Sequence, residues 1–357
     1  MHPHSPFHRR RSAPSAGGMA ATPRALPAAD GVALWAPLTA DDVLPVLGLL
    51  RECEAHDSAP FRSTMDEVAE LFQQEVLHVA IGALDGTGAL IAFGIVRVLD
   101  EGAVVDARCS GAVHPGHRDR QIGSAIIAWQ ISTARELLAS FDIAGGAQIS
   151  HFCSESARDE ATLLEAAGFT PRGWFTQMRR NLSREIPVVE MAGHLRIEPW
   201  KSEWSEMIRD DSDGPEALTA AGRGLTEDEW ERMHANLVPE WSAVVIDRSN
   251  DRSRIAGYVM AARFEDDWDA LGWSEGYINA LSIFSRWRKQ RVGQCLLTHT
   301  MLRMRADGMQ FAGIDIGSED LDGLDDLSET MGFEPTHRTM LYVIEVADSA
   351  KWLSRSQ

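Results

Sequence analysis

Apolar and polar residues follow one another along this chain in an order that occurs twice. In each half, apolar runs with the two-residue period of a strand alternate with runs that have the 3.6-residue period of a helix. The strands predicted for the first half lie near residues 76–83, 90–98, 104–113, 148–153 and 174–178. Its helices are predicted near residues 41–56, 64–75, 123–138 and 159–167. Ser63 is the predicted cap of the second helix.

The second half repeats this order. Its strands are predicted near residues 195–199, 242–247, 255–263, 277–283, 312–317 and 341–346, and its helices near 293–306 and 324–331. Early strands followed by a crossover helix predict an α+β fold, with a mixed, mostly antiparallel sheet flanked by helices in each half. The domains expected from this pattern are residues 32–183 and 194–350, with a linker at 184–193 and a disordered tail at 1–31.

A basic turn that carries a glycine occupies the same place in both halves. The first copy runs from Val113 to Ser124 and the second from Ile283 to Gln294. Each turn joins the end of an apolar strand to the start of an amphipathic helix. The unpaired N–H groups at such a helix start are a favourable site for a phosphate group. The sequence therefore predicts two phosphate-binding turns on duplicated domains.

A second repeated landmark supports the duplication. Gly168-Phe169 and Gly332-Phe333 each follow a predicted short helix, at a similar distance after the turn. A glycine just past a helix is typical of a left-handed C-terminal cap. Two landmarks in the same order predict that the two halves share one fold.

Composition narrows the classes of function. The chain has 357 residues and a formal net charge of −19, which disfavours nucleic acid as a partner because phosphate backbones would be repelled. No apolar run approaches the ~18 residues of a membrane span, so no membrane association is expected. The four cysteines have neither disulfide nor metal-ligand spacing. We therefore expect a cytoplasmic protein without a metal.

The two turns carry a resemblance to a known family. Arg118-Asp-Arg-Gln121-Ile-Gly123 and Arg288-Lys-Gln-Arg291-Val-Gly293 resemble the Arg/Gln-x-x-Gly-x-Gly/Ala signature of the GNAT superfamily of acetyl-CoA-dependent N-acetyltransferases. The first glycine of the signature is replaced in both copies, by Gln121 and Arg291. A non-glycine residue there can still offer its N–H group to a phosphate if its φ is negative. The second half also resembles the C-terminal half of tandem actinobacterial acetyltransferases, a group that includes mycothiol synthase.

The resemblance implies a cofactor, a reaction and a set of site residues. Acetyl-CoA is the expected co-substrate, and a small-molecule amine is the expected acceptor, which attacks the thioester directly. The residues expected to bind the cofactor in the second half are Leu281, Ser282, Ile283, Arg288, Lys289, Gln290, Arg291, Val292, Gly293 and Gln294. In the first half they are Val113, Arg118, Gln121, Ile122, Gly123 and Ser124. The second half is the expected catalytic one.

Residues for proton transfer are less clearly marked. The tyrosine that many family members use to protonate the leaving thiolate is replaced by Ser328 in the second half and by Leu164 in the first. An asparagine often found some eight residues earlier is replaced by Asp320 and Ser156. Glu275 is the candidate general base, with a structural role as its alternative. Asp315 and His337 are weaker candidates.

Two other functions fit the same sequence. The lost glycines and tyrosines are also compatible with a catalytically degenerate CoA-binding or scaffold protein. A narrower alternative is mycothiol synthase activity, with a cysteinyl pseudo-disaccharide as the acceptor. The oligomeric state stays open.

Overall fold

The structure is a computed structural model that describes residues 26–59, 61–100, 104–141, 146–212, 234, 236–249, 253–318 and 323–346. These residues form two compact units. Unit 1 contains the described residues up to 173 together with 339–346, and unit 2 contains those from 174 to 338. Most of the tail predicted at 1–31 lies outside the described residues, so that prediction stays untested.

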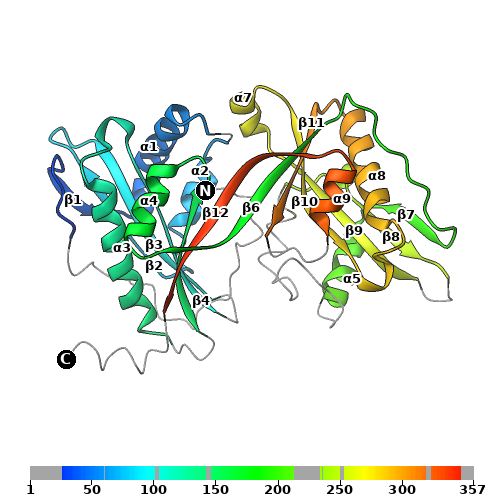
Figure 1. The fold of residues 1–357 in the computed structure, drawn as a ribbon, viewed down its shortest axis with the longest axis horizontal. Coiled ribbons are helices and arrows are strands. Elements are labelled where there is room, and N and C mark those ends of the chain that lie inside the picture. Colours follow the sequence, from blue (N-terminus) through cyan, green and yellow to red (C-terminus); the bar gives the residue numbers. More distant parts are fainter. Residues whose placement is uncertain are drawn as a thin grey trace. The chain divides into compact units, whose positions relative to one another are not determined.

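Unit 1 has a six-stranded sheet and four α-helices among its described residues, together with the first residues of β6. They are β1 (Leu34–Pro37), α1 (Val43–His56), α2 (Met65–Leu71), β2 (His78–Leu84), β3 (Leu90–Asp100), β4 (Val105–Val113), α3 (Ile122–Leu138), β5 (Ala147–Ser154), α4 (Arg158–Ala166), the start of β6 (Thr170–Asn181) and the end of β12 (Glu334–Val346). The sheet order is β1-β2-β3-β4-β5-β12, and only β4 and β5 pair in parallel (Figure 1).

Alternation along β3 explains how helices cover both faces of this sheet. Phe93 and Ile95 pack into a cluster with α1 and α2, whereas Ala92 and Val96 belong to a second cluster with α3. Gly94 lies on the α3 face, where an added Cβ would come within 2.5 Å of Ile126. The period of two therefore gives this strand an apolar side chain on each face.

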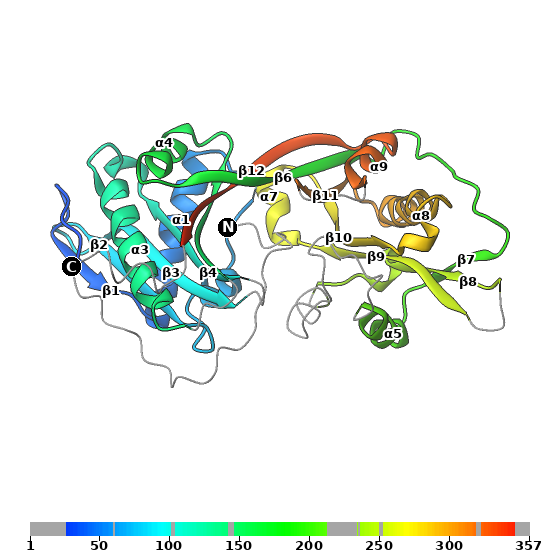
Figure 2. The same ribbon diagram turned by 60° about the horizontal axis from the view of Figure 1, so that its bottom comes forward.

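Unit 2 repeats the order of the strands, with one additional short helix, α7, among its described elements. They are the rest of β6, β7 (Leu195–Pro199), α5 (Ser202–Ser212), β8 (Ala243–Asp247), β9 (Arg254–Arg263), α7 (Trp268–Leu271), β10 (Glu275–Ile283), α8 (Val292–Ala306), β11 (Phe311–Gly317), α9 (Leu324–Thr330) and the start of β12. Its sheet order is β7-β8-β9-β10-β11-β6, with β10 and β11 parallel. Figure 2 shows α8 and α9 on one side of this sheet and α5 on the other.

The last strands of the two halves are exchanged, which the sequence did not predict. Residues 339–346 of β12 pair with β5 of unit 1, and residues 175–181 of β6 pair with β11 of unit 2. The first half of the chain thus supplies the final strand of unit 2, and the second half supplies that of unit 1. Hydrophobic period cannot reveal such an exchange, because it predicts a strand but not the partner with which that strand pairs.

Helix caps confirm one prediction and correct another. Gly168 and Gly332 have φ values of 97° and 82°, the left-handed conformation expected after α4 and α9. The cap of α2 is Thr64, whose side chain accepts from the N–H of Glu67, and not Ser63. Ser63 instead donates its N–H and hydroxyl to the buried carboxylate of Glu54.

Candidate functional site

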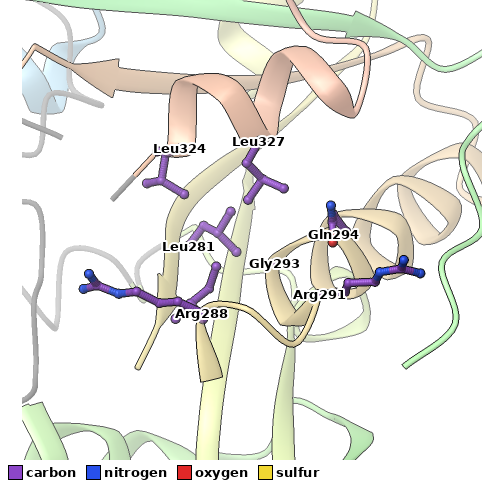
Figure 3. Close-up of a pocket in the computed structure, with 9 residues that line it drawn as sticks. Leu281, Arg288, Arg291, Gly293, Gln294, Leu324 and Leu327 are labelled. Atoms are coloured by element: carbon purple, nitrogen blue, oxygen red, sulfur yellow. The ribbon is translucent and has the colours of Figure 1, made fainter. Parts of the chain in front are cut away.

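The turn between β10 and α8 borders a pocket in unit 2. The pocket encloses about 140 Å³ and is lined by Leu281, Ile283, Arg288, Arg291, Gly293, Gln294, Gly323, Leu324 and Leu327. In Figure 3, Leu324 and Leu327 reach from α9 toward Leu281, with Arg288 to one side and Arg291 and Gln294 to the other. Six of the ten residues predicted in this half therefore lie around one cavity. The contribution of α9 was missed because it lies some thirty residues further along the chain.

The remaining predicted residues of this turn lie beside the pocket. Val292 is fully buried against Gly257, and the Ser282 hydroxyl interacts with the Tyr258 side chain on the neighbouring strand. Burial raises the pKa of Tyr258 to about 12, so this phenol stays protonated at neutral pH. Lys289 is exposed, and Gln290 donates its backbone N–H to Trp287.

Charge and backbone polarity both favour an anion at this turn. Residues 288–294 carry three cations, Arg288, Lys289 and Arg291, and no acidic side chain. The first N–H groups of α8 have no partner within the helix, and its dipole places partial positive charge at that end. A phosphate or pyrophosphate group is the ligand that such a turn binds best.

The residue before each helix has an unusual backbone conformation. Gln121 caps α3 with φ 63°, and Arg291 caps α8 with φ 59°. Both values lie in the left-handed region, which costs a non-glycine residue about 1–2 kcal/mol. The negative φ considered from the sequence is therefore not what the structure has. The turn keeps the conformation that glycine allows, although glycine is absent.

This strain predicts that glycine stabilises both turns. Gln121→Gly and Arg291→Gly should each raise the free energy of unfolding by about 1 kcal/mol, measured by urea titration of the full chain. Only Arg291→Gly removes a cation from the pocket, so only this variant should weaken acetyl-CoA binding, by roughly threefold. Lower stability in both variants would show that the left-handed conformation carries no strain.

In the matching turn of unit 1, the positive charge of Arg118 is neutralised by an acidic side chain of the same unit. Arg118 donates two hydrogen bonds of 2.7 Å to the two oxygens of Asp57, at the end of α1. These bonds lower the pKa of Asp57 and raise that of Arg118. Sequence reasoning missed this partner because Asp57 lies 61 residues before Arg118. An anion at this turn must compete with a carboxylate that is already in place.

The backbone of this turn also differs from that of unit 2. The Val113 carbonyl, at the end of β4, accepts from Arg118 Nε at 3.2 Å and from Cys53 Sγ at 3.4 Å. Arg118 is extended (φ −65°, ψ 166°), whereas the matching Arg288 is helical (φ −53°, ψ −35°). Of the other predicted residues, Ile122 is buried in the core and Ser124 is exposed. The two turns are thus alike in sequence but not in geometry.

Glu275, the candidate base, is buried in an ion pair. Its Oε2 accepts from Arg179 Nε at 2.6 Å and from Trp273 Nε1 at 3.1 Å. The Arg179 guanidinium also lies 4.7 Å from the centre of a Trp273 ring. A Cβ at Gly313 would collide with the other carboxylate oxygen. These contacts supply the structural role that the sequence left as the alternative.

The two residues that replace the family's tyrosine, Ser328 and Leu164, are buried. Ser328 on α9 is completely buried, and its hydroxyl has no hydrogen-bond partner in the described part of the chain. Leu164, its counterpart on α4, is also completely buried in the core of unit 1. The Ser156 hydroxyl lies 2.7 Å from that of Ser154, and Asp320 lies outside the described residues. Neither Ser328 nor Leu164 presents a proton donor to a ligand.

The described residues contain no group of three or more His, Cys, Asp or Glu side chains able to hold a metal ion. Within the same residues, no helix combines the length and apolar character that crossing a membrane requires.

No protein-family model matches the chain, and no curated protein matches it in sequence. Solved structures do match. A GCN5-related N-acetyltransferase from Sphaerobacter thermophilus aligns with a TM-score of 0.67 at 16% identity, over 90% of this chain and 97% of its own. A tandem GNAT protein from the clavulanic acid biosynthesis pathway aligns with a TM-score of 0.65 at 16% identity, over 88% and 99%.

A third structure extends the range of acyl groups among the matches. The N-myristoyltransferase of Saccharomyces cerevisiae, solved with bound myristoyl-CoA, aligns with a TM-score of 0.53 at 15% identity, over 90% of this chain and 80% of its own. At such identities the likeness establishes the fold alone. Together with the repeated order of strands and helices in the two units, it shows that this chain has the fold of a tandem GNAT protein.

Proposed function

We propose that this chain transfers an acetyl group from acetyl-CoA to a small-molecule amine, with unit 2 as the catalytic unit. The observation that carries the proposal is the cationic turn from Arg288 to Gln294, which opens α8 and borders a pocket. The structural matches support it, because an acyl-CoA ligand and acetyltransferase activity are named among them. Unit 2 is favoured over unit 1 because Arg118, in the turn of unit 1, is already hydrogen-bonded to Asp57.

The proposed binding mode follows from the geometry of the turn. The pyrophosphate of acetyl-CoA would lie at the N–H groups of Val292, Gly293 and Gln294, where Arg288 and Arg291 add positive charge. The pantetheine arm would run along β10 beside Leu281. A strand edge offers N–H and C=O groups that can bind the amides of this arm and stabilise charge on the thioester oxygen.

The reaction needs little from the protein beyond alignment. The amine nitrogen attacks the thioester carbon, its C–N bond forms as the C–S bond breaks, and the acetyl group is left as an amide. The thiolate leaves with the electron pair of the C–S bond and takes up one proton, while the nitrogen loses one. Holding both substrates in line supplies much of the rate. Glu275 lies six residues before the pocket residue Leu281, roughly 20 Å along the strand, so Glu275 could accept the proton only through water.

A second candidate function is a CoA-binding protein without transferase activity. The buried Ser328 and the left-handed Arg291 favour it, because both depart from the catalytic pattern of the family. An acceptor screen separates the two functions. The full chain, acetyl-CoA and a panel of glucosamine, spermidine, lysine and tyramine would be mixed, and free CoA thiol would be followed with time. We expect amine-dependent thiol release with one acetylated amine per thiol. Acetyl-CoA binding without release for any amine would favour the binding protein.

Ser328 gives a further prediction for the transferase. Ser328→Ala removes a buried hydroxyl that has no partner, so the free energy of unfolding should stay the same or rise by about 1 kcal/mol. The rate of thiol release should change less than twofold, because this hydroxyl does not protonate the thiolate. A collapse of the rate with normal stability and acetyl-CoA binding would make Ser328 the acid.

A further inference from the structure

The turn of unit 1 carries acidic side chains where the turn of unit 2 has none. Asp119 stands at the position that Lys289 occupies in the second copy. Asp57 reaches the same turn from the end of α1 and accepts two hydrogen bonds from Arg118. Residues 118–124 carry two arginines, so these two carboxylates offset their positive charge. The matching turn of unit 2 has three cations and no acidic side chain, so only that turn offers a phosphate a surplus of positive charge.

The short helix α4 covers the turn of unit 1 as α9 covers that of unit 2. An added Cβ at Gly293 would come within 2.7 Å of Leu327 on α9, and one at Gly123 would come within 3.4 Å of Leu163 on α4. The second residue of the long helix therefore lies against the same position of the short helix in each unit. Residues of α4 and α9 can thus be matched one by one, with Leu163 in the place of Leu327.

A third carboxylate replaces an apolar side chain of the pocket. The pocket residue Leu324 lies three positions before Leu327, and the matching residue of α4 is Glu160. The Glu160 carboxylate accepts from Cys153 Sγ at 3.5 Å and lies 3.8 Å from His151 Nε2. Both partners belong to β5, so Glu160 points from its helix toward the sheet, as Leu324 does in Figure 3. Unit 1 thus has an acid where unit 2 has an apolar wall.

Each carboxylate opposes a different part of an acyl-CoA. The two oxygens of Asp57 accept from one guanidinium in the paired geometry with which arginine also binds a phosphate. Asp57 therefore occupies the bonding positions that a pyrophosphate needs. Asp119 adds a negative charge, which repels a phosphate. The half-exposed Glu160 keeps its water only if the apolar arm of a ligand stays away, because the burial of a charge is unfavourable.

Resting on the function proposed above, we propose that Asp57, Asp119 and Glu160 exclude acyl-CoA from unit 1. Asp57 acts as a built-in substitute for the pyrophosphate, and the other two carboxylates repel the phosphates and the acyl arm. Release from Asp57 also frees Arg118 to take the helical conformation of Arg288. These three side chains therefore set the number of cofactors per chain, and unit 1 without them becomes a second acyl-CoA site.

Calorimetry of the full chain with acetyl-CoA compares the wild type with the triple variant Asp57→Ala, Asp119→Asn, Glu160→Leu. Asparagine is chosen at position 119 because it tolerates the left-handed φ of 62° found there. The wild type should bind one acetyl-CoA per chain and the triple variant two. Glu75→Gln with Glu136→Lys is the matched control, because it raises the net charge equally at exposed positions outside both turns. This control should bind one acetyl-CoA.

Further variants locate the binding. Adding Gly293→Val to the triple variant should weaken one of its two sites more than tenfold and leave the other unchanged. Leu324→Glu alone places a carboxylate on the wall of the unit 2 pocket and should weaken acetyl-CoA binding about tenfold or more. If the triple variant does not fold, the double variant Asp119→Asn with Glu160→Leu takes its place. This variant keeps the bonds of Asp57 and should show a second, weaker site.

Several results would overturn the inference while the proposed function stands. They are a single site in the folded triple variant, no second site in the double variant that replaces it, and two sites in the charge control or in the wild type. A wild-type chain that binds no acetyl-CoA would overturn the proposed function. A site that then appeared only in the triple variant would still support the exclusion, and no site in any variant would overturn both.

Discussion

Gly293→Val should weaken acetyl-CoA binding by more than tenfold. A Cβ at this position would come within 2.6 Å of Ile283 Cδ1 and 2.7 Å of Leu327 Cδ2, so these two side chains, which line the pocket, have to shift. The valine side chain also takes up room beside the N–H groups that would bind the pyrophosphate. Isothermal titration calorimetry of the full chain with acetyl-CoA measures the change.

Gly123→Val is the matched control for this variant. An added Cβ there meets Leu163 at 3.4 Å, an ordinary contact, and we assign no cofactor to unit 1. The affinity of Gly123→Val for acetyl-CoA should equal that of the wild type. Lys289→Glu adds a test without crowding, because Lys289 is exposed, and it should weaken binding by roughly five- to tenfold at low salt. Wild-type affinity in both unit 2 variants would place the cofactor elsewhere.

The second large effect concerns the ion pair of Glu275 and Arg179. Glu275→Gln leaves a buried guanidinium without its charged partner, so the free energy of unfolding should fall by about 3–5 kcal/mol. Replacing both residues, as Glu275→Leu with Arg179→Met, should recover most of this loss because neither charge remains. Urea unfolding of the full chain, followed by tryptophan fluorescence, measures both changes.

The same variants decide whether Glu275 is also a base. Rates are compared at a temperature where each variant is folded. If Glu275 relays a proton through water, kcat falls roughly a hundredfold in the single and the double variant alike. If the carboxylate only anchors Arg179, the folded double variant keeps its activity. A single variant as stable as the wild type would contradict the ion-pair account.

Much of the fold followed from the sequence because local patterns determine it. The strand before each turn, the helix after it and the glycines at 168 and 332 are set by residues within a few positions of one another. The destination of the last strands is not local. β6 and β12 each follow a short helix and a Gly-Phe pair, and the choice between the two sheets depends on pairings across more than a hundred residues.

In the candidate site, too, the residues set by local sequence could be predicted, and those set by distant contacts could not. The turn residues Arg288, Arg291 and Gly293 could be named because they lie close together in one basic, glycine-bearing segment. The Asp57 partner of Arg118 could not, since it depends on a contact between distant residues. Glu275 could be named from the sequence, but its role could not. A glutamate at the start of a strand has the same sequence pattern whether it accepts a proton or pairs with an arginine.

The central claim is that unit 2 holds one acyl-CoA at its turn, and calorimetry of the wild-type chain beside two matched variants tests it most directly. We expect one acetyl-CoA per chain, an affinity that falls at least fivefold in Arg288→Ala, and no change in Arg118→Ala. Two sites per chain, loss of binding in Arg118→Ala alone, or no binding at all would contradict the account.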